Sequence, residues 1–319
     1  MTMMFVDFKE GMTDKVAPAL VDTFLRHSEV LQLMPFDNAV SPTGGSTLTY
    51  GYMQTKLPST ASFRPLNTEY TASEATVERK NVDLKVFGGK FSMDRVLKQA
   101  EGKFNNMAFQ LEQKIAAATS LFHWTMINGN ATTNAAEFDG LDKMLAGTKT
   151  EFDAASIDLS TAAQIEANAS AFYEMLQLLI SDTNADALMM NGRMRAKVDT
   201  VARVLGYKTE SEDAFGKKVV SMGGVRFIDL QNHYTVSDGA ATMSPIVGID
   251  GGLTDIYGVK FDVNDGFHGV TLTGNAGLSH YLPDFNQPGA VKDGEVEMTA
   301  AVVLKNTQRA GVLRDVKIA

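Results

Sequence analysis

Residues 57–97 of the chain read LPSTASFRPLNTEYTASEATVERKNVDLKVFGGKFSMDRVL, and most of the predicted fold follows from them. The first part of this stretch has no regular spacing of apolar residues, but strand-like alternation flanks it on both sides. The alternating residues are Leu48, Tyr50 and Tyr52 before it, and Val82, Leu84 and Val86 after it. We therefore predict two strands, the second ending at Gly88-Gly89, with a long connection at 58–74 between them.

The connection at 58–74 stands out because it is about 17 residues long. Hairpin loops are ordinarily about 2–5 residues long, and structureless loops above about 12–15 residues in compact domains are usually functional or disordered. The segment has large aromatic residues at Phe63 and Tyr70 and little between them to build a core. Two interpretations stay open: a mobile surface loop, or an arm that projects from the body and becomes ordered on another molecule.

A long helix is predicted directly after the second strand. Apolar residues recur at gaps of one, three or four from Val96 to Met126, and Ser92 is the expected N-cap. The Asn-Gly-Asn sequence at 128–130 is a signal for the helix end, and Gly102 is a position where the first third could break. At about 1.5 Å per residue, a helix over 92–128 would be roughly 50 Å long, which suits a flat, extended body.

The other periodic segments indicate a mixed α/β pattern. We expect helices over 12–33, 171–180 and 193–205, a break at 41–46, and strands over 187–190, 218–222, 225–230 and 244–250, with Gly223-Gly224 between two of these strands. The strongest strand signal comes late in the chain, where the alternation is unbroken at Val296, Met298, Ala300, Val302 and Leu304.

Composition narrows the function classes. The chain has 319 residues, enough for two domains, and 44% of them are hydrophobic. Its formal net charge of −9 argues against nucleic acid as a direct ligand, because tight phosphate binding needs a concentrated basic surface. The absence of cysteine excludes disulfides, thiolate metal sites and a cysteine nucleophile. No signal peptide or membrane-spanning stretch is recognised, so we expect a protein made and kept in a cytosol, without a membrane partner.

Tests for chemical motifs find none that is complete. Two Gly-Lys pairs lack the first glycine of a phosphate loop, and the acidic turn at Asp262, Asn264 and Asp265 lacks the closing glutamate of a calcium loop, so a polar turn is expected there. No two of the five histidines have metal-ligand spacing. We predict no catalytic residue, no cofactor and no metal. One basic cluster is interpreted as a solvated or salt-bridged helix face: Arg193, Arg195, Lys197, Arg203 and Lys208.

The order of these elements resembles the major capsid proteins of tailed bacteriophages, which have the Hong Kong 97-type fold. FLRHSEVLQLMPF at 24–36 resembles their N-terminal segment, and 57–97 resembles their extended loop running into the spine helix. INGNATTNAAEFDGL at 127–141 resembles the turn after that helix, and EVEMTAAVVLKN at 295–306 resembles the late strand of the peripheral domain. The likeness covers essentially the whole chain as a sum of weak motifs.

The resemblance implies an α+β fold with a definite division of the chain. The expected parts are an N-terminal arm (1–45), an extended β-hairpin loop (46–91), a peripheral domain with the spine helix and a second helix at 165–180 (92–181), an axial α/β domain (182–284) and return strands of the peripheral domain (285–319). In the family, the extended loop reaches over a neighbouring subunit. By position, the expected inter-subunit contacts are therefore Phe63, Arg64, Asn67 and Tyr70, the first three forming the aromatic-Arg-x-x-Asn pattern.

The implied function is that of a major capsid protein rather than an enzyme. The subunits would form hexamers and pentamers of an icosahedral phage head, made in the bacterial cytoplasm and enclosing double-stranded DNA without sequence-specific binding. A portal protein at one vertex, a decoration protein and a separate scaffolding protein are the further partners. The separate scaffold is expected because only about 45 residues precede the hairpin, and Lys56 alone near the loop gives no reason to expect a crosslink.

Two alternatives remain. The first is an encapsulin, a nanocompartment shell protein of the same fold that encloses an enzyme cargo, with the segment at 12–33 as the docking helix for the cargo peptide. The second is an enzyme with an unrecognised site. The failure of every catalytic and cofactor motif tested argues against it. Closed shells or rings of five or six subunits would separate both shell proteins from such an enzyme.

Overall fold

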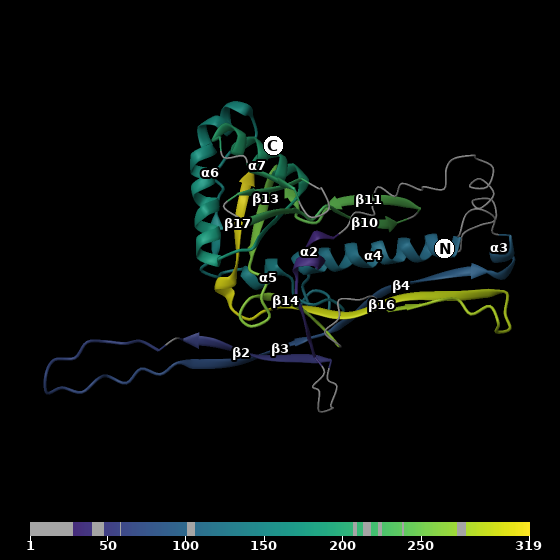
Figure 1. Cartoon of the computed structure of the whole chain (residues 1–319), viewed down its shortest axis with the longest axis horizontal. Helices are drawn as coiled ribbons and strands as arrows, with labels where there is room; N and C mark the ends of the chain where they lie inside the picture. The colour runs from purple at the N-terminus through teal and green to yellow at the C-terminus, as the bar shows by residue number, and fades with distance from the viewer. Residues whose placement is uncertain are drawn as a thin grey trace.

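The computed structural model describes residues 28–39, 48–57, 59–100, 106–206, 209–212, 218–222, 225–237, 239–272 and 279–319. These residues form an elongated molecule with a mixed helix-and-sheet body and a thin hairpin that extends from it (Figure 1). Of the helix expected over 12–33, the described part contains the short helix α2 (Glu29–Leu33). The expected break at 41–46, Gly102 and Gly223-Gly224 lie outside the described residues.

The first layer of the body is a five-stranded sheet covered by a long helix. Strand β16 (Val291–Leu304) pairs along one edge with β4 (Lys85–Asp94) and along the other with β15 (Ser279–Tyr281) and β14 (Phe267–Thr271), and β1 (Phe36–Asn38) is parallel to β14. Helix α4 (Asn106–Asn128) lies along this sheet (Figure 1). The predicted late strand is confirmed, and its alternate residues Val296, Met298 and Ala300 are buried.

The strand predicted to end at Gly88-Gly89 is in fact two strands, and the prediction was wrong there. β3 (Thr76–Asp83) ends before the buried Leu84, and β4 then runs through both glycines. A Cβ atom at Gly88 would lie 1.9 Å from the carbonyl oxygen of Val296 on β16. The missing side chain therefore serves the close approach of two strands rather than a turn.

The start of the long helix also differs from the prediction. β4 continues to Asp94, whose carboxylate accepts a hydrogen bond from the Val96 N–H at 2.7 Å and so caps helix α3 (Arg95–Gln99). Ser92, the predicted N-cap, lies in β4 and donates instead to the Asp293 carboxylate at 2.6 Å. Helix α4 has 23 residues, about 35 Å at 1.5 Å per residue, and its end at Asn128 is as predicted.

The second layer is an eight-stranded sheet with helices α6 (Ala162–Thr183) and α7 (Gly192–Val204) packed on it. Its order is β5 (Glu151–Asp153), β17 (Ala310–Lys317), β13 (Leu253–Val259), β6 (Ala187–Met190), β9 (Val225–Asp229), β8 (Lys218–Met222) and β7 (Thr209–Glu212), with β12 (Ile249–Asp250) paired to β13. The short helix α5 (Leu141–Leu145) lies between α4 and this sheet, and a 3-10 turn (Thr307–Arg309) precedes β17. The helices and strands expected at 171–180, 187–190, 193–205, 218–222 and 225–230 are confirmed.

The single strand expected at 244–250 does not form. β11 (Ala240–Pro245) stops at Pro245, which lacks the N–H needed to continue a ladder, and β12 begins at Ile249. Between them Ile246 and Val247 are buried in a bend, and the Ile246 N–H donates to the Gln231 carbonyl at 3.0 Å. The apolar run reflects burial in the core rather than strand pairing.

Two apolar cores hold the layers together. One lies beneath α4 and the five-stranded sheet and includes Phe122, Met126 and Phe267, and the other lies between α6, α7 and the eight-stranded sheet and includes Phe172 and Leu176. Each fully buried side chain of this size contributes about 1.5–3 kcal/mol. The eight-stranded sheet includes β17, from the predicted peripheral range 285–319, and α6, mostly from the range 92–181, packs on it. The same sheet also contains strands from the predicted axial range 182–284. The division into peripheral and axial domains therefore stays a prediction.

Candidate inter-subunit surfaces

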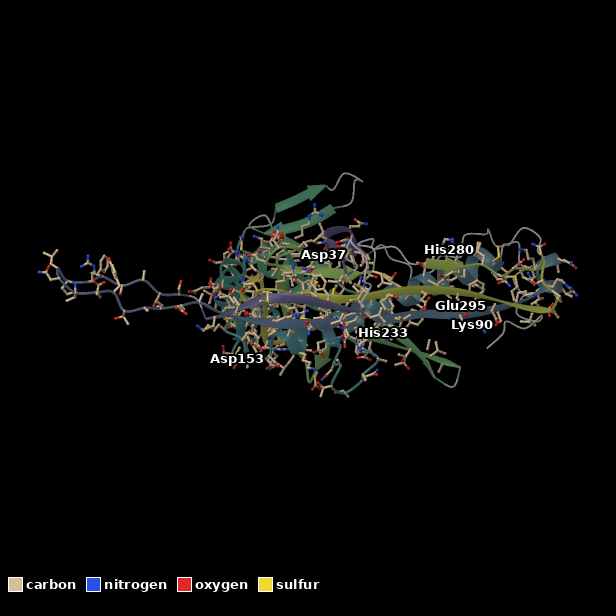
Figure 2. All side chains as sticks on the ribbon, turned by 90° about the horizontal axis from the view of Figure 1, so that it is seen from below. Asp37, Lys90, Asp153, His233, His280 and Glu295 are labelled. Carbon is tan, nitrogen blue, oxygen red and sulfur yellow. The ribbon has the colours of Figure 1, made fainter. Side chains whose placement is uncertain are left out.

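The extended hairpin is the most prominent feature outside the two layers. β2 (Thr49–Leu57) and β3 pair antiparallel from Thr49↔Asp83 to Leu57↔Thr76 as a separate two-stranded sheet. The connection 59–75 continues this hairpin far from the body, and the two views agree on its direction (Figures 1 and 2). The predicted long hairpin with a projecting connection is thus present in the structure.

The tip of the connection has local order of its own. The Arg64 guanidinium donates to the Thr68 carbonyl at 3.0 Å and lies 5.2 Å from the centroid of the Tyr70 ring, a cation–π contact. The Thr68 hydroxyl donates to the Pro65 carbonyl at 2.9 Å, and Asn67 has a left-handed backbone with φ of 62°. Asparagine tolerates this conformation better than most residues, so Asn67 shapes the turn.

The four predicted contact residues therefore differ in their local contacts and exposure. Arg64 and Tyr70 come together within the tip and Asn67 lies in its turn, whereas the Phe63 ring is fully exposed. Phe63 is 105% exposed and Leu66 is 91% exposed, so both keep their apolar surface in water. Burying a side chain of this size is worth about 1.5–3 kcal/mol, and nothing in the loop's own structure realises that gain.

The end of the molecule opposite the hairpin, where α3 and the start of β16 lie (Figure 1), also carries exposed apolar side chains. We use the name distal patch for Val96 on α3, Tyr281, Leu282 and Val291, each at least half exposed. Close by, the Lys98 ammonium lies 4.7 Å from the centroid of the Phe285 ring. The sequence pattern missed this patch because it assigned Val96 to the buried face of a continuous helix.

A third surface is the hairpin of β10 (Asn232–Ser237) and β11, which lies beside α4 (Figure 1). On the side toward α4, the His233 ring stacks on Trp124 with centroids 5.2 Å apart and lies 3.1 Å from the Ser120 hydroxyl. Burial lowers the pKa of His233. Val236 and Met243 of the same hairpin remain 67% and 52% exposed. Two-stranded hairpins are marginal alone, so the His233 contacts help to fix this one to the body.

The outer face of the β4–β16 pair is charged rather than apolar. Lys90 and Glu295 are opposite each other in the ladder, and the Lys90 ammonium binds the Asp293 carboxylate at 2.7 Å (Figure 2). This pair is exposed, so it contributes to solubility and surface complementarity more than to stability.

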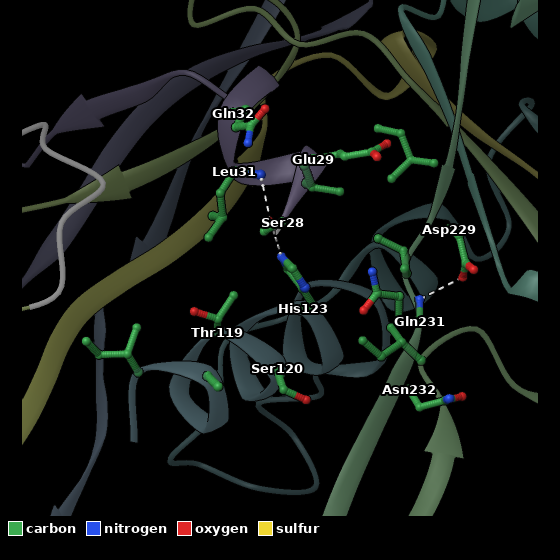
Figure 3. A pocket seen from close by; sticks show the side chains of 16 residues that line it. Ser28, Glu29, Leu31, Gln32, Thr119, Ser120, His123, Asp229, Gln231 and Asn232 are labelled. Carbon is green, nitrogen blue, oxygen red and sulfur yellow. Dashed lines mark hydrogen bonds between the residues drawn. The ribbon is translucent and has the colours of Figure 1, made fainter. Parts of the chain in front are cut away.

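A groove of about 460 Å³ separates α2, α4 and the β9–β10 connection (Figure 3). At its wall the His123 ring nitrogen Nε2 is 2.7 Å from the Ser28 hydroxyl, and burial lowers the pKa of His123 to about 4. The same hydroxyl accepts a hydrogen bond from the Leu31 N–H at 3.1 Å. Ser28 is thus the N-cap of α2, and the serine–histidine contact ties α2 to α4.

The remaining sequence motifs have structural roles. In the acidic turn, the Asp262 carboxylate accepts from the Asn264 N–H at 2.9 Å and Asp265 pairs with Arg309 at 2.8 Å, as expected for a polar turn. In the basic cluster, Lys197 donates to two backbone carbonyls before α6, and Lys208 lies outside the described residues. Within the described ranges, no group of three or more acidic or histidine side chains is arranged to hold a metal.

None of the helices in the described part of the chain is both long enough and apolar enough to span a membrane.

No family model matches the chain, and no curated protein sequence does. Its structure nevertheless matches solved shell proteins over nearly its full length. The holo-SrpI encapsulin complex from Synechococcus elongatus PCC 7942 matches with a TM-score of 0.67 and 12% identity, over 99% of this chain and 97% of that one. The capsid of a native GTA particle matches with a TM-score of 0.61 and 12% identity over 99% of both chains. Mycobacterium phage Bobi matches with a TM-score of 0.59 and 12% identity, over 98% and 99%.

These similarities define the fold. The chain has the mixed helix-and-sheet fold that phage capsid proteins and encapsulins share, as the resemblance implied. The similarity includes both ends of the described chain and both sheets, because each match spans at least 98% of the chain.

Proposed function

We propose that the chain is a major capsid protein, and that it assembles into hexamers and pentamers of an icosahedral phage head around double-stranded DNA. The observation that supports this most is the extended hairpin, because it carries a connection with exposed Phe63 and Leu66 that the chain itself does not bury. Similarity to phage capsid chains from end to end supports the proposal that a neighbouring copy covers this hairpin. The role is structural, with no catalytic step.

The proposal assigns parts of the chain to parts of a shell. Residues 46–91 are the extended loop, 92–181 and 285–319 the peripheral domain, and 182–284 the axial domain. Phe63, Arg64, Asn67 and Tyr70 are the inter-subunit contacts of the loop. The protein resides in the virion, and a portal, a decoration protein and a separate scaffold are its expected partners.

The encapsulin alternative rests on a specific observation. An encapsulin complex matches with a TM-score of 0.67 and a GTA capsid with 0.61, so fold similarity does not separate the two kinds of shell. An encapsulin shell would enclose a protein cargo, whereas a phage head encloses DNA. Particles isolated from the native source distinguish them by content: nucleic acid throughout the interior supports the capsid, and an enclosed protein without packaged DNA supports the encapsulin.

The first experiment is assembly of the purified chain. Sedimentation velocity at micromolar concentration, combined with negative-stain microscopy, is expected to show closed shells or rings of five or six subunits. A folded species near 34.5 kDa as the only form would contradict both shell functions. Such a result would return the connection 59–75 to the interpretation of a mobile surface loop.

A further inference from the structure

Side chains at the base of the extended hairpin contribute to its direction. In the described part of the chain, β2 and β3 pair only with each other, and the backbone joins them to the five-stranded sheet through the buried Leu84, which links β3 to β4. Alternate residues on one face of β2 supply the side-chain attachment. The Tyr52 hydroxyl donates to the Leu304 carbonyl at 3.4 Å, and the Gln54 amide donates to the Lys305 carbonyl at 3.0 Å.

Tyr50 is the centre of this attachment. Its hydroxyl donates to the Asp37 carboxylate on β1 at 2.6 Å. Its ring meets the His268 ring of β14 edge-on, with centroids 6.0 Å apart and planes at 75°, and the Lys305 ammonium lies 5.5 Å from the Tyr50 centroid. Three other segments of the chain therefore converge on one tyrosine at the root of the hairpin.

His268 is the unusual member of this group. It is 0% exposed, and neither of its ring nitrogens has a hydrogen-bond partner in the structure. Burial, and then the positive charge of Lys305, lower the pKa of His268 to about 4, while Asp37 and the carbonyls of Gly266 and Asp262 act weakly in the other direction. At neutral pH the ring is thus an uncharged, apolar-like packing element beneath Tyr50.

We propose that Asp37, Tyr50, His268 and Lys305 form a pH-sensitive latch, which fixes the direction of the extended hairpin while His268 is neutral and releases it when His268 takes up a proton. Burial and repulsion by Lys305 disfavour an imidazolium at this position, and the carbonyls of Gly266 and Asp262 offset only part of that cost. The Asp37 carboxylate, which would favour the charged ring, is bound by the Tyr50 hydroxyl. A protonated ring therefore gains by reaching water or by taking Asp37 from Tyr50, and both changes weaken the Tyr50 part of the attachment of β2.

The direction of the pH effect follows from linkage. Released His268 titrates near its ordinary pKa of about 6.5, and latched His268 near about 4. The released form therefore gains population as pH falls through this window, at most tenfold per pH unit for one proton. The latch is a property of a single chain, so it holds whether or not the chain forms a shell.

The test measures the hairpin direction directly. The chain has no cysteine, so Val77→Cys on β3 and Leu178→Cys on α6 introduce two unique labelling sites at exposed positions. Spin labels at these sites give the hairpin-to-body distance by double electron–electron resonance at pH 7.5 and pH 4.5, with labelled chains diluted among unlabelled copies. We expect the distance distribution to shift or broaden at pH 4.5 in the parent, and to stay at its pH 7.5 form in His268→Phe.

His123→Gln is the matched control, because it removes the other buried histidine whose pKa is lowered to about 4 but leaves the hairpin base intact. This variant should respond to pH as the parent does. If His268→Phe does not fold, Tyr50→Phe removes only the bond to Asp37 and should show the released distribution already at pH 7.5. An identical parent distribution at both pH values, a pH response that persists in His268→Phe, or a parent-like Tyr50→Phe would overturn the latch.

Discussion

The connection 59–75 and helix α6 are two parts of one chain whose side chains find partners in opposite ways. Phe172 on α6 is 0% exposed, whereas Phe63 in the connection is 105% exposed. Arg314, in the strand beneath α6, binds the carboxylates of Asp142, Asp255 and Glu151, whereas Arg64 is held by a backbone carbonyl and a ring within its own turn. The body is stabilised by contacts inside the chain, whereas the large apolar side chains Phe63 and Leu66 of the connection are left exposed by it.

Removal of a body aromatic should give the largest loss of subunit stability. Phe172→Ala leaves a cavity among fully buried side chains of α6 and the eight-stranded sheet, and we expect a loss of about 3–5 kcal/mol in the free energy of unfolding. Phe63→Ala, the same change in the connection, should alter that free energy by less than about 0.5 kcal/mol. Urea denaturation of the two variants measures the difference, and equal losses would remove the contrast between the two regions.

Acid should weaken the body through His123. The pKa of this buried ring is about 4 in the folded chain against about 6.5 when unfolded, so below pH 6.5 the unfolded chain binds a proton that the folded chain does not. Stability is therefore lost as pH falls from 6.5 to 4, by up to about 3 kcal/mol from this group. The pH dependence of unfolding should be shallower in His123→Gln by that amount, and parallel curves would show that His123 does not carry it.

Loss of the Arg314 ion pairs should give the next largest loss of subunit stability. Arg314→Met leaves three carboxylates facing one another, and since Asp142 is 48% exposed we expect a loss of about 2 kcal/mol, below the value for a fully buried pair. Lys317→Met, which removes a more exposed pair with Asp158 in the same strand, serves as the control and should cost much less. Thermal unfolding compares the two, and a similar effect of both changes would count against the Arg314 network.

The spacing of apolar residues was enough to predict those elements whose structure depends on residues close in sequence. The alternation at 296–304 gave a strand with one buried face, the run at 187–190 gave a buried strand, and the aperiodic segment after Leu57 gave the projecting connection. These features depend on residues close in sequence, so the period alone predicts them.

The pattern failed where distant residues decide the structure. Gly88 indicates a turn when read locally, but its lack of a side chain is needed because Val296, far along the chain, approaches it. Tyr50 was recognised as a strand residue, but its partners Asp37 and His268 come from two other strands. The distal patch was missed for the same reason, since the start of α3 depends on the N-cap at Asp94 and on the pairing of β4 with β16.

The central claim is that residues 59–75 stabilise an assembly and not the fold of the subunit, and the double variant Phe63→Ala/Arg64→Ala tests it most directly. The change removes an exposed aromatic anchor and the guanidinium that orders the tip, residue types that contribute about 2 kcal/mol or more each when they are interface hot spots. Circular dichroism should show an unchanged subunit, while sedimentation and electron microscopy should show that shells or rings no longer form at concentrations where the parent assembles. Parent-like shells of unchanged thermal stability, or loss of helical signal together with assembly, would contradict the claim.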